Sequence, residues 1–134
     1  MKIKMNSTYA LLGACVLGIG LLAIGAFWPV ENNGGKPSEK ALKDFATCIT
    51  QSGAKFYGAF WCPHCKEQKA MFSHATSSLP YVECSTPDEN GQTQVCIDAG
   101  IKGYPTWEFK DGERVSGVQT LATLAEKTSC PLPK

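Results

Sequence analysis

The 134-residue sequence has little net charge and no run of basic residues. Its 13 lysines and arginines nearly balance 12 acidic residues, which leaves a formal net charge of +1. Proteins that hold nucleic acid or an anionic surface through charge carry clustered basic residues, so neither kind of partner is implied. The sequence also shows no internal repeat and no low-complexity tract. A chain of this length indicates one folded domain.

Charged side chains are absent from residues 9–30. An apolar run of this length can cross a bilayer as a helix. Lys2 and Lys4 precede the run, and the first acidic residue after it is Glu31. That distribution favours an N-terminus that stays in the cytoplasm. We therefore expect a cytoplasmic N-terminus at residues 1–8, a single transmembrane anchor at 9–30 and an extracytoplasmic domain after it.

Two other interpretations of the apolar run stay open. A cleaved signal peptide has a shorter apolar core and a small-residue cleavage site, whereas this run continues to Trp28 and Pro29. Cys15 follows Leu-Gly-Ala, which resembles a lipoprotein signal, but the residues after it are apolar, as around a buried cysteine in a membrane helix. A polar linker with turn-forming residues spans 31–38, so the folded domain is expected at 39–134.

Two cysteines lie one helical turn apart, Cys62 and Cys65, at the junction of an expected strand and an expected helix. The short aromatic run 54–60 is typical of a buried strand, and residues 66–73 carry good helix formers. Cys62 would then lie at a helix N-terminus, where unpaired N–H groups and the helix dipole favour a thiolate. Cys65 would be shielded one turn further in. The spacing allows a disulfide to close and open reversibly, which indicates thiol-disulfide exchange.

The rest of the domain alternates between the periodicities of helices and strands. Ser38 can cap a helix that Gly53 ends, and Thr120 can start the last helix. Hydrophobic spacing and turn signals predict helices and strands in the order helix, strand, helix, strand, helix, strand, strand, helix. The expected segments after the cysteine-bearing helix are a strand at 79–84, a helix at 92–99, a hairpin at 106–117 and a helix from 120. This order implies an α/β fold with a mixed sheet covered by helices on both faces.

These features resemble the thioredoxin superfamily. The resemblance rests on the element order, on Trp61-Cys62-Pro63-His64-Cys65 at a strand-to-helix junction, and on Gly103-Tyr104-Pro105-Thr106 before the closing hairpin. It implies that the Tyr104-Pro105 bond is cis and that Pro105 lies against the active-site disulfide. The backbone of Tyr104 would then pair with an extended substrate segment.

A closer likeness covers the chain from about Leu42 to Thr128. It rests on residues 53–65, 80–84 and 100–107 and on Cys96. These segments are similar to the thioredoxin-like domain associated with bacterial vitamin K epoxide reductase homologues, membrane enzymes that pass electrons from thiols to a quinone. The resemblance implies that the domain is a separate redox partner of such a membrane protein, held at the membrane by its own helix. We expect no cofactor besides the Cys62/Cys65 disulfide, and quinone only through that partner.

The resemblance also assigns roles around the two thiols. Cys62 would be the attacking cysteine and Cys65 the resolving one. Pro63 and His64 form the dipeptide that DsbA carries between its cysteines, where the thiolate is stabilised and the disulfide is strongly oxidising. His64 would act as a donor near the Cys62 sulfur, and Trp61 would cover the disulfide.

One position departs from the family. Thioredoxin and DsbA carry a buried carboxylate six residues before the first active-site cysteine, where it assists proton transfer to the buried thiol. The residue here is Phe56. Glu83 or water are the candidates to replace that function.

The remaining cysteines allow several pairings. Cys84 and Cys96 enclose a turn-rich loop, so they favour a structural disulfide, and a second exchange-active pair is the alternative. A zinc site that includes Cys62 and Cys65 would need two further ligands, and Cys84 with Cys96 is spaced too widely for a zinc knuckle. We predict that no metal is bound. Cys48 and Cys130 can form a second disulfide, or Cys48 can be buried and Cys130 free.

The sequence therefore predicts a membrane-anchored, extracytoplasmic thiol-disulfide oxidoreductase. In the favoured direction it takes electrons from the thiols of folding extracytoplasmic proteins and passes them to a membrane partner of the vitamin K epoxide reductase type. The opposite direction, in which the domain reduces or isomerises disulfides with electrons from the cytoplasm, uses the same residues. A non-catalytic peptide-binding module is the third possibility, against which the intact Cys62/Cys65 pair and the proline motif argue.

Overall fold

The computed structural model describes residues 35–134. The expected N-terminus at 1–8, the anchor at 9–30 and the start of the linker lie outside the described residues. Within residues 35–134, no helix has both the length and the apolarity that a bilayer span requires. The linker ends where expected, because Ser38 caps the first described helix through its side chain.

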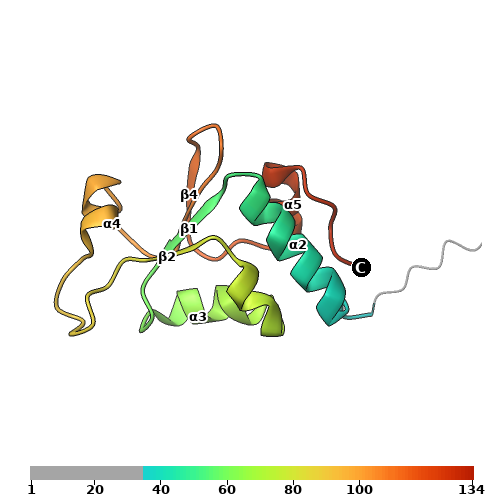
Figure 1. The fold of residues 1–134 in the computed structure, drawn as a ribbon, viewed down its shortest axis with the longest axis horizontal. Helices are drawn as coiled ribbons and strands as arrows, with labels where there is room; N and C mark the ends of the chain where they lie inside the picture. Colours follow the sequence, from blue (N-terminus) through green and yellow to red (C-terminus); the bar gives the residue numbers. More distant parts are fainter. Residues whose placement is uncertain (1–34) are drawn as a thin grey trace, which may run out of the picture. The chain divides into compact units, whose positions relative to one another are not determined.

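The order of helices and strands agrees with the order predicted from the sequence, with one short helix added (Figure 1). The α-helices are α2 (Glu39–Gln51), α3 (Pro63–Ala70), α4 (Gln94–Asp98) and α5 (Leu121–Thr128). The strands are β1 (Lys55–Gly58), β2 (Tyr81–Glu83), β3 (Thr106–Glu108) and β4 (Arg114–Ser116). The added element is a 3-10 helix, η1 (Ser73–Ser78).

The four strands form one mixed sheet in the order β2-β1-β3-β4. Strand β1 pairs parallel with β2, and the register places Gly58 beside Glu83. Strands β3 and β4 run antiparallel to their neighbours. Because side chains alternate between the faces of a strand, Phe56 and Gly58 of β1 share one face of the sheet and Tyr57 points to the other.

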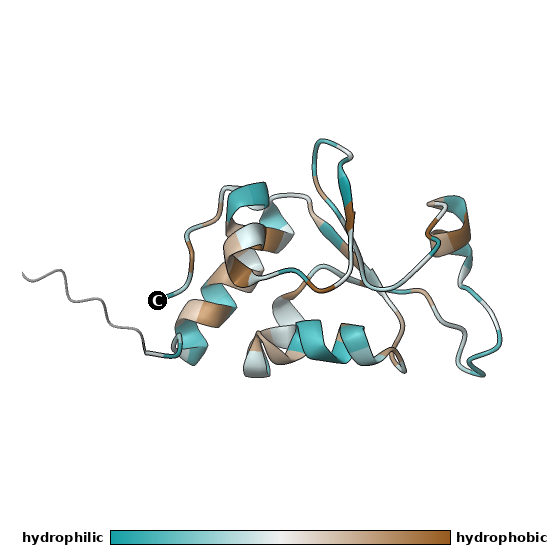
Figure 2. Ribbon diagram, turned by 180° about the vertical axis from the view of Figure 1, so that it is seen from behind, coloured by the Kyte–Doolittle hydropathy of each residue, from teal (hydrophilic) through white to brown (hydrophobic). Residues whose placement is uncertain are grey.

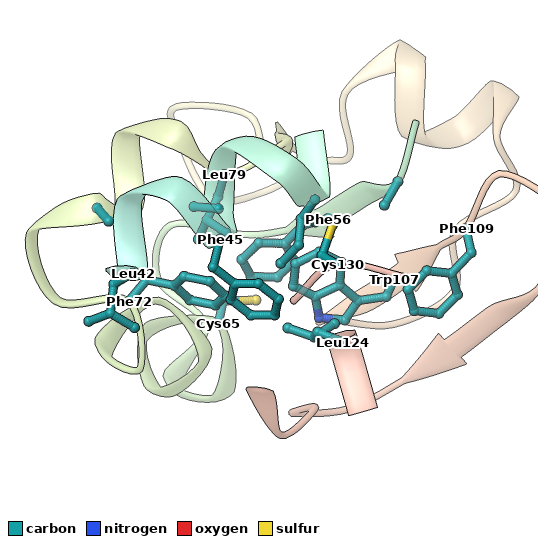
Figure 3. Packing of buried hydrophobic residues seen from close by; sticks show 14 of the residues in the cluster. Leu42, Phe45, Phe56, Cys65, Phe72, Leu79, Trp107, Phe109, Leu124 and Cys130 are labelled. Atoms are coloured by element: carbon teal, nitrogen blue, oxygen red, sulfur yellow. The ribbon is translucent and has the colours of Figure 1, made fainter. Parts of the chain in front are cut away.

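The two faces of the sheet are covered unequally. One face carries the larger core, built on Phe56 and Trp107, whose rings stack with centroids 4.7 Å apart. Helices α2, α3, η1 and α5 contribute to this core, and Figure 3 shows its aromatic rings together with the sulfur of Cys65. On the other face, Tyr57 packs with a smaller cluster that includes Cys84 and Cys96. Figure 2 shows hydrophilic and hydrophobic residues interspersed along the helices.

The helix that follows Cys62 is shorter than predicted. Good helix formers were expected through residue 73, but α3 ends at Ala70, and Ser73 takes a positive φ of 50° at the start of η1. The break turns Phe72 into the core, where it is fully buried and stacks on Phe45. His74 therefore belongs to η1 and not to the cysteine-bearing helix. Burial of Phe72 outweighs the local preference for a longer helix.

Candidate active site

The site begins at the N-terminus of α3. Cys62 is the N-cap residue with an extended backbone, and Pro63 occupies the first helical position. Proline suits that position because its missing N–H would have no partner inside the helix. The Cys62 carbonyl accepts the N–H of Lys66 at 3.1 Å. This arrangement leaves the Cys62 sulfur at the end of the helix where backbone dipoles favour negative charge.

The two thiols of the motif are unequal. Both are unbridged in the structure, and Cys62 keeps 5 % of its surface exposed whereas Cys65 keeps 1 %. Burial raises the pKa of the Cys65 thiol to about 12, and its hydrogen bond with Cys62 adds to the rise. Cys65 therefore holds its proton in the dithiol form, whereas the Cys62 sulfur lies at the N-terminal end of α3.

The proline loop lies against Cys62. The Tyr104-Pro105 peptide bond is cis, as the resemblance implied, and Pro105 is fully buried. The Cys62 thiol donates to the Tyr104 carbonyl, with sulfur and oxygen 3.7 Å apart. The structure thus brings Cys62, Tyr104 and Pro105 together from segments far apart in the sequence.

Trp61 closes one side of the site. Its indole N–H donates to Ser85 Oγ at 2.7 Å, and its ring meets the Tyr104 ring edge-on, with centroids 6.3 Å apart. The Tyr104 hydroxyl accepts a hydrogen bond from Gln92 Nε2 at 2.7 Å. These bonds hold both aromatic rings in place. Trp61 nevertheless stays 41 % exposed, and Phe60 beside it is exposed to a similar extent, so an apolar surface borders Cys62.

His64 contacts Glu67 on the surface of α3. Its side chain is 70 % exposed, and its Nδ1 lies 3.5 Å from Glu67 Oε2. The sulfur of Cys62 hydrogen-bonds to the Tyr104 carbonyl instead.

Cys65 lies against β1 and β2. A Cβ added to Gly58 would be 2.9 Å from Cys65 Sγ, 2.7 Å from Tyr81 Cε2 and 3.4 Å from Tyr81 Oη. Contacts below 3.0 Å are too close for carbon, so only glycine leaves room here for the Cys65 sulfur beside the Tyr81 ring. Phe56, at the position of the family's carboxylate, is occupied in stacking on Trp107.

Polar groups approach Cys65 from β2 and from α3. The Tyr81 hydroxyl donates to Glu83 Oε2 at 2.8 Å. Burial, followed by this hydrogen bond, raises the pKa of Tyr81. Lys69 Nζ lies 3.3 Å from the centroid of the Tyr81 ring, and burial lowers the pKa of its ammonium group.

The carboxylate of Glu83 is held in place by the backbone. Its Oε1 accepts the N–H of Ser85 at 2.8 Å and that of Phe60 at 3.3 Å. Glu83 is half-buried, so it connects the buried surroundings of Cys65 with the surface beside the active-site loop.

The other four described cysteines form two disulfides. Cys84 is bonded to Cys96, and both residues are fully buried. Cys48 of α2 is bonded to Cys130, which follows α5. Because Cys84 and Cys96 are bonded to each other, their sulfurs are not available as thiolate ligands for a zinc site with Cys62 and Cys65. The burial of the Cys84–Cys96 disulfide favours a structural role over a second exchange-active pair, because exchange requires access to sulfur.

Sequence reasoning did not find Tyr81 and Lys69. A signal for Tyr81 was present in Tyr81-Val82-Glu83, where alternation puts the tyrosine and the glutamate on one face of an expected strand. The register of β2 against β1, which directs that face toward Cys65, follows only from the fold.

Comparisons with known proteins agree with this geometry. The thioredoxin family model matches residues 39–129. Thiol-disulfide oxidoreductase LTO1 of Arabidopsis thaliana is 49% identical over 88 residues, which cover 63% of this chain and 23% of that protein. The thioredoxin domain-containing protein 5 homolog of Drosophila melanogaster is 37% identical over 82 residues, 54% of this chain and 19% of that protein. The chain therefore spans less than a quarter of the length of either relative.

Proposed function

The chain belongs to the thioredoxin family, and from that premise we propose that it is a thiol-disulfide oxidoreductase in which Cys62 exchanges with partner proteins while Cys65 resolves. The observation that carries this assignment is the inequality of the two thiols. Cys62 lies at the helix N-terminus beside the proline loop. Cys65 is buried with its pKa raised to about 12.

In the favoured, oxidative direction, a substrate thiolate attacks Cys62 Sγ of the closed disulfide. The bond between Cys62 and Cys65 breaks, and its electron pair goes to Cys65 Sγ, which takes up a proton. A second substrate thiolate then attacks the substrate sulfur of the mixed disulfide and releases Cys62 as a thiolate. The substrate leaves with a new disulfide, and the domain is left with two reduced cysteines.

Reoxidation reverses these roles. The Cys62 thiolate attacks a disulfide of the membrane partner and forms a mixed disulfide with it. Cys65 loses its proton and attacks Cys62, which closes the domain's disulfide and releases the partner's sulfur. The two electrons then belong to the partner, for which we propose a quinone-linked enzyme of the vitamin K epoxide reductase type, in line with the resemblance of residues 42–128.

The location proposed for these reactions is the extracytoplasmic side of a membrane, with residues 9–30 as the anchor. Two disulfides outside the active site support it, Cys48–Cys130 and Cys84–Cys96. Structural disulfides persist in oxidising compartments and are rare in the cytosol. The uncharged run at 9–30 with lysines before it supports the anchor and its orientation.

We propose that substrates are extended segments of unfolded proteins. The exposed rings of Phe60 and Trp61 border Cys62, and the Tyr104 backbone lies beside its sulfur. An apolar border with an adjacent backbone suits a chain that presents its own backbone and apolar side chains. Such a surface selects unfolded segments without reading one sequence.

Trapping of mixed disulfides tests the assignment. With Cys65→Ser in the full chain, Cys62 can attack but no resolving thiol remains, so complexes should accumulate in cells. They should contain extracytoplasmic thiol proteins and a multi-span membrane protein. Cys62→Ser is the matched control and should trap none. Equal trapping by both variants would overturn the roles, and trapped partners that are all cytoplasmic would overturn the location.

A further inference from the structure

Cys65 is buried. The position at which the family carries a proton-accepting carboxylate is occupied by Phe56, which stacks on Trp107. Each closing of the Cys62/Cys65 disulfide must remove a proton from Cys65, and each opening must return one. Bulk water reaches this thiol poorly because only 1 % of the surface of Cys65 is exposed. A proton path to Cys65 therefore has to be formed by neighbouring side chains.

Tyr81 is the polar side chain that Gly58 allows beside the Cys65 sulfur. A Cβ added to Gly58 would lie 2.9 Å from Cys65 Sγ and 3.4 Å from Tyr81 Oη. Both atoms therefore border the same small space above Gly58. From there the path continues outward, because the Tyr81 hydroxyl donates to Glu83 Oε2 at 2.8 Å. Glu83 is half-buried and is oriented by the N–H groups of Ser85 and Phe60.

We propose that the Tyr81 hydroxyl and the Glu83 carboxylate form the path by which the proton of Cys65 leaves and returns. When the disulfide closes, Cys65 Sγ gives its proton to Tyr81 Oη while Tyr81 passes its own proton to Glu83 Oε2. The electron pair left on Cys65 forms the bond to Cys62, and the partner's sulfur leaves Cys62 with the pair of the broken bond. Glu83 then releases the proton to water, and opening runs the same steps backward.

Charges around Cys65 fit this path. Cys62 just before α3, Lys69 of α3 and Tyr81 of β2 lie near Cys65. Glu83 of β2 lies near Lys69 and Tyr81. The Lys69 ammonium lies over the Tyr81 ring, where its positive charge favours the anions formed during transfer. On β1, the face toward Cys65 carries Phe56 and Gly58, neither of which titrates.

The proposal rests on the proposed exchange between Cys62 and Cys65, and the full chain in mild detergent tests both. All proteins carry Cys15→Ala, so that no third thiol reacts, and keep both structural disulfides closed. The protein with its Cys62/Cys65 pair reduced is mixed with dithionitrobenzoate, an aromatic disulfide whose released thiolate is coloured. Attack by Cys62 releases one thiolate at a rate that depends on reagent concentration. Resolution by Cys65 releases a second thiolate at a rate that does not. The two phases report the two cysteines separately.

Tyr81→Phe keeps the ring and removes the hydroxyl. The second phase should slow by about 100-fold, the lower part of the range for a positioned acid-base group, while the first phase stays unchanged. The deficit should shrink as pH rises, because hydroxide then takes the proton directly. Glu83→Gln should slow the same phase. Tyr57→Phe is the matched control, since the Tyr57 side chain lies on the other face of β1, and it should change neither phase.

The outcomes separate the two proposals. If the wild type shows both phases and Tyr81→Phe shows a second phase of normal rate, the proton path is overturned and the exchange stays in place. If Tyr81→Phe does not fold, an unchanged second phase in Glu83→Gln overturns the path. Equal slowing of both phases, independent of pH, would also contradict it, since that is the effect of a lost structural contact. A wild type that releases no second thiolate overturns the exchange itself, and the path with it.

Discussion

The disulfide between Cys48 and Cys130 should contribute a large part of the domain's stability. It joins residues 82 positions apart and ties the segment after α5 to α2. Closing a loop of that length restricts the unfolded chain by about 4.5 kcal/mol on the loop-entropy estimate, against about 3 kcal/mol for a separation of 12 as between Cys84 and Cys96. Small domains are stable by only about 5–15 kcal/mol in total.

Three variants measure this contribution. Cys48→Ala, Cys130→Ala and the double variant all lack the bridge, so each should lose about 4 kcal/mol of unfolding free energy. The losses should not add, because either single change already removes the whole constraint. Urea unfolding of the full chain without reductant gives all three values. Small losses that add in the double variant would show that the bridge does not form in solution and would refute the reasoning.

Three further predictions concern the surroundings of the active site. Cys84 and Cys96 are fully buried, so their disulfide should resist reductant that already opens the active-site pair; alkylation at graded reductant with mapping of the modified cysteines checks this, and simultaneous opening would make them a second relay. Gly58→Ala would place a Cβ 2.7 Å from Tyr81 Cε2 and should cost about 1–3 kcal/mol in urea unfolding as an overpacked core. Gly103→Ala, which meets no atom within 4 Å, should be nearly neutral, and equal losses in both variants would contradict the close contact. Finally, burial raises the pKa of Cys65 to about 12 in the folded dithiol form, whereas an unfolded thiol titrates near about 8.5. Above that lower value the unfolded chain releases a proton that the folded chain retains, so unfolding free energy should fall as pH rises toward about 12; Cys65→Ala should remove this part of the slope, and an unaltered slope would speak against the buried thiol.

Local signals were sufficient to predict most of the fold. Ser38 and Thr120 cap their helices through their side chains as expected, and Gly53 takes the positive φ that ends a helix. These positions are determined by a few neighbouring residues, which is why the sequence alone identifies them. The spacing of Cys62 and Cys65 is local in the same sense.

What the sequence did not predict depends on contacts between distant segments. The early end of α3 follows from burying Phe72 against Phe45 of α2. The hydrogen bond of Cys62 goes to Tyr104, 42 residues away in the chain, which local spacing could not indicate. The position of Tyr81 beside Cys65 requires the register of β2 and the absence of a side chain at Gly58.

The reduction potential of the Cys62/Cys65 pair tests the central claim most directly. The measurement equilibrates the full chain with glutathione buffers and counts the open and closed pair by alkylation and mass. An oxidant of substrate thiols should show a potential well above the roughly −270 mV of thioredoxin, toward the roughly −120 mV of DsbA. A value at or below that of thioredoxin would contradict the oxidative direction and would indicate a domain that reduces disulfides instead.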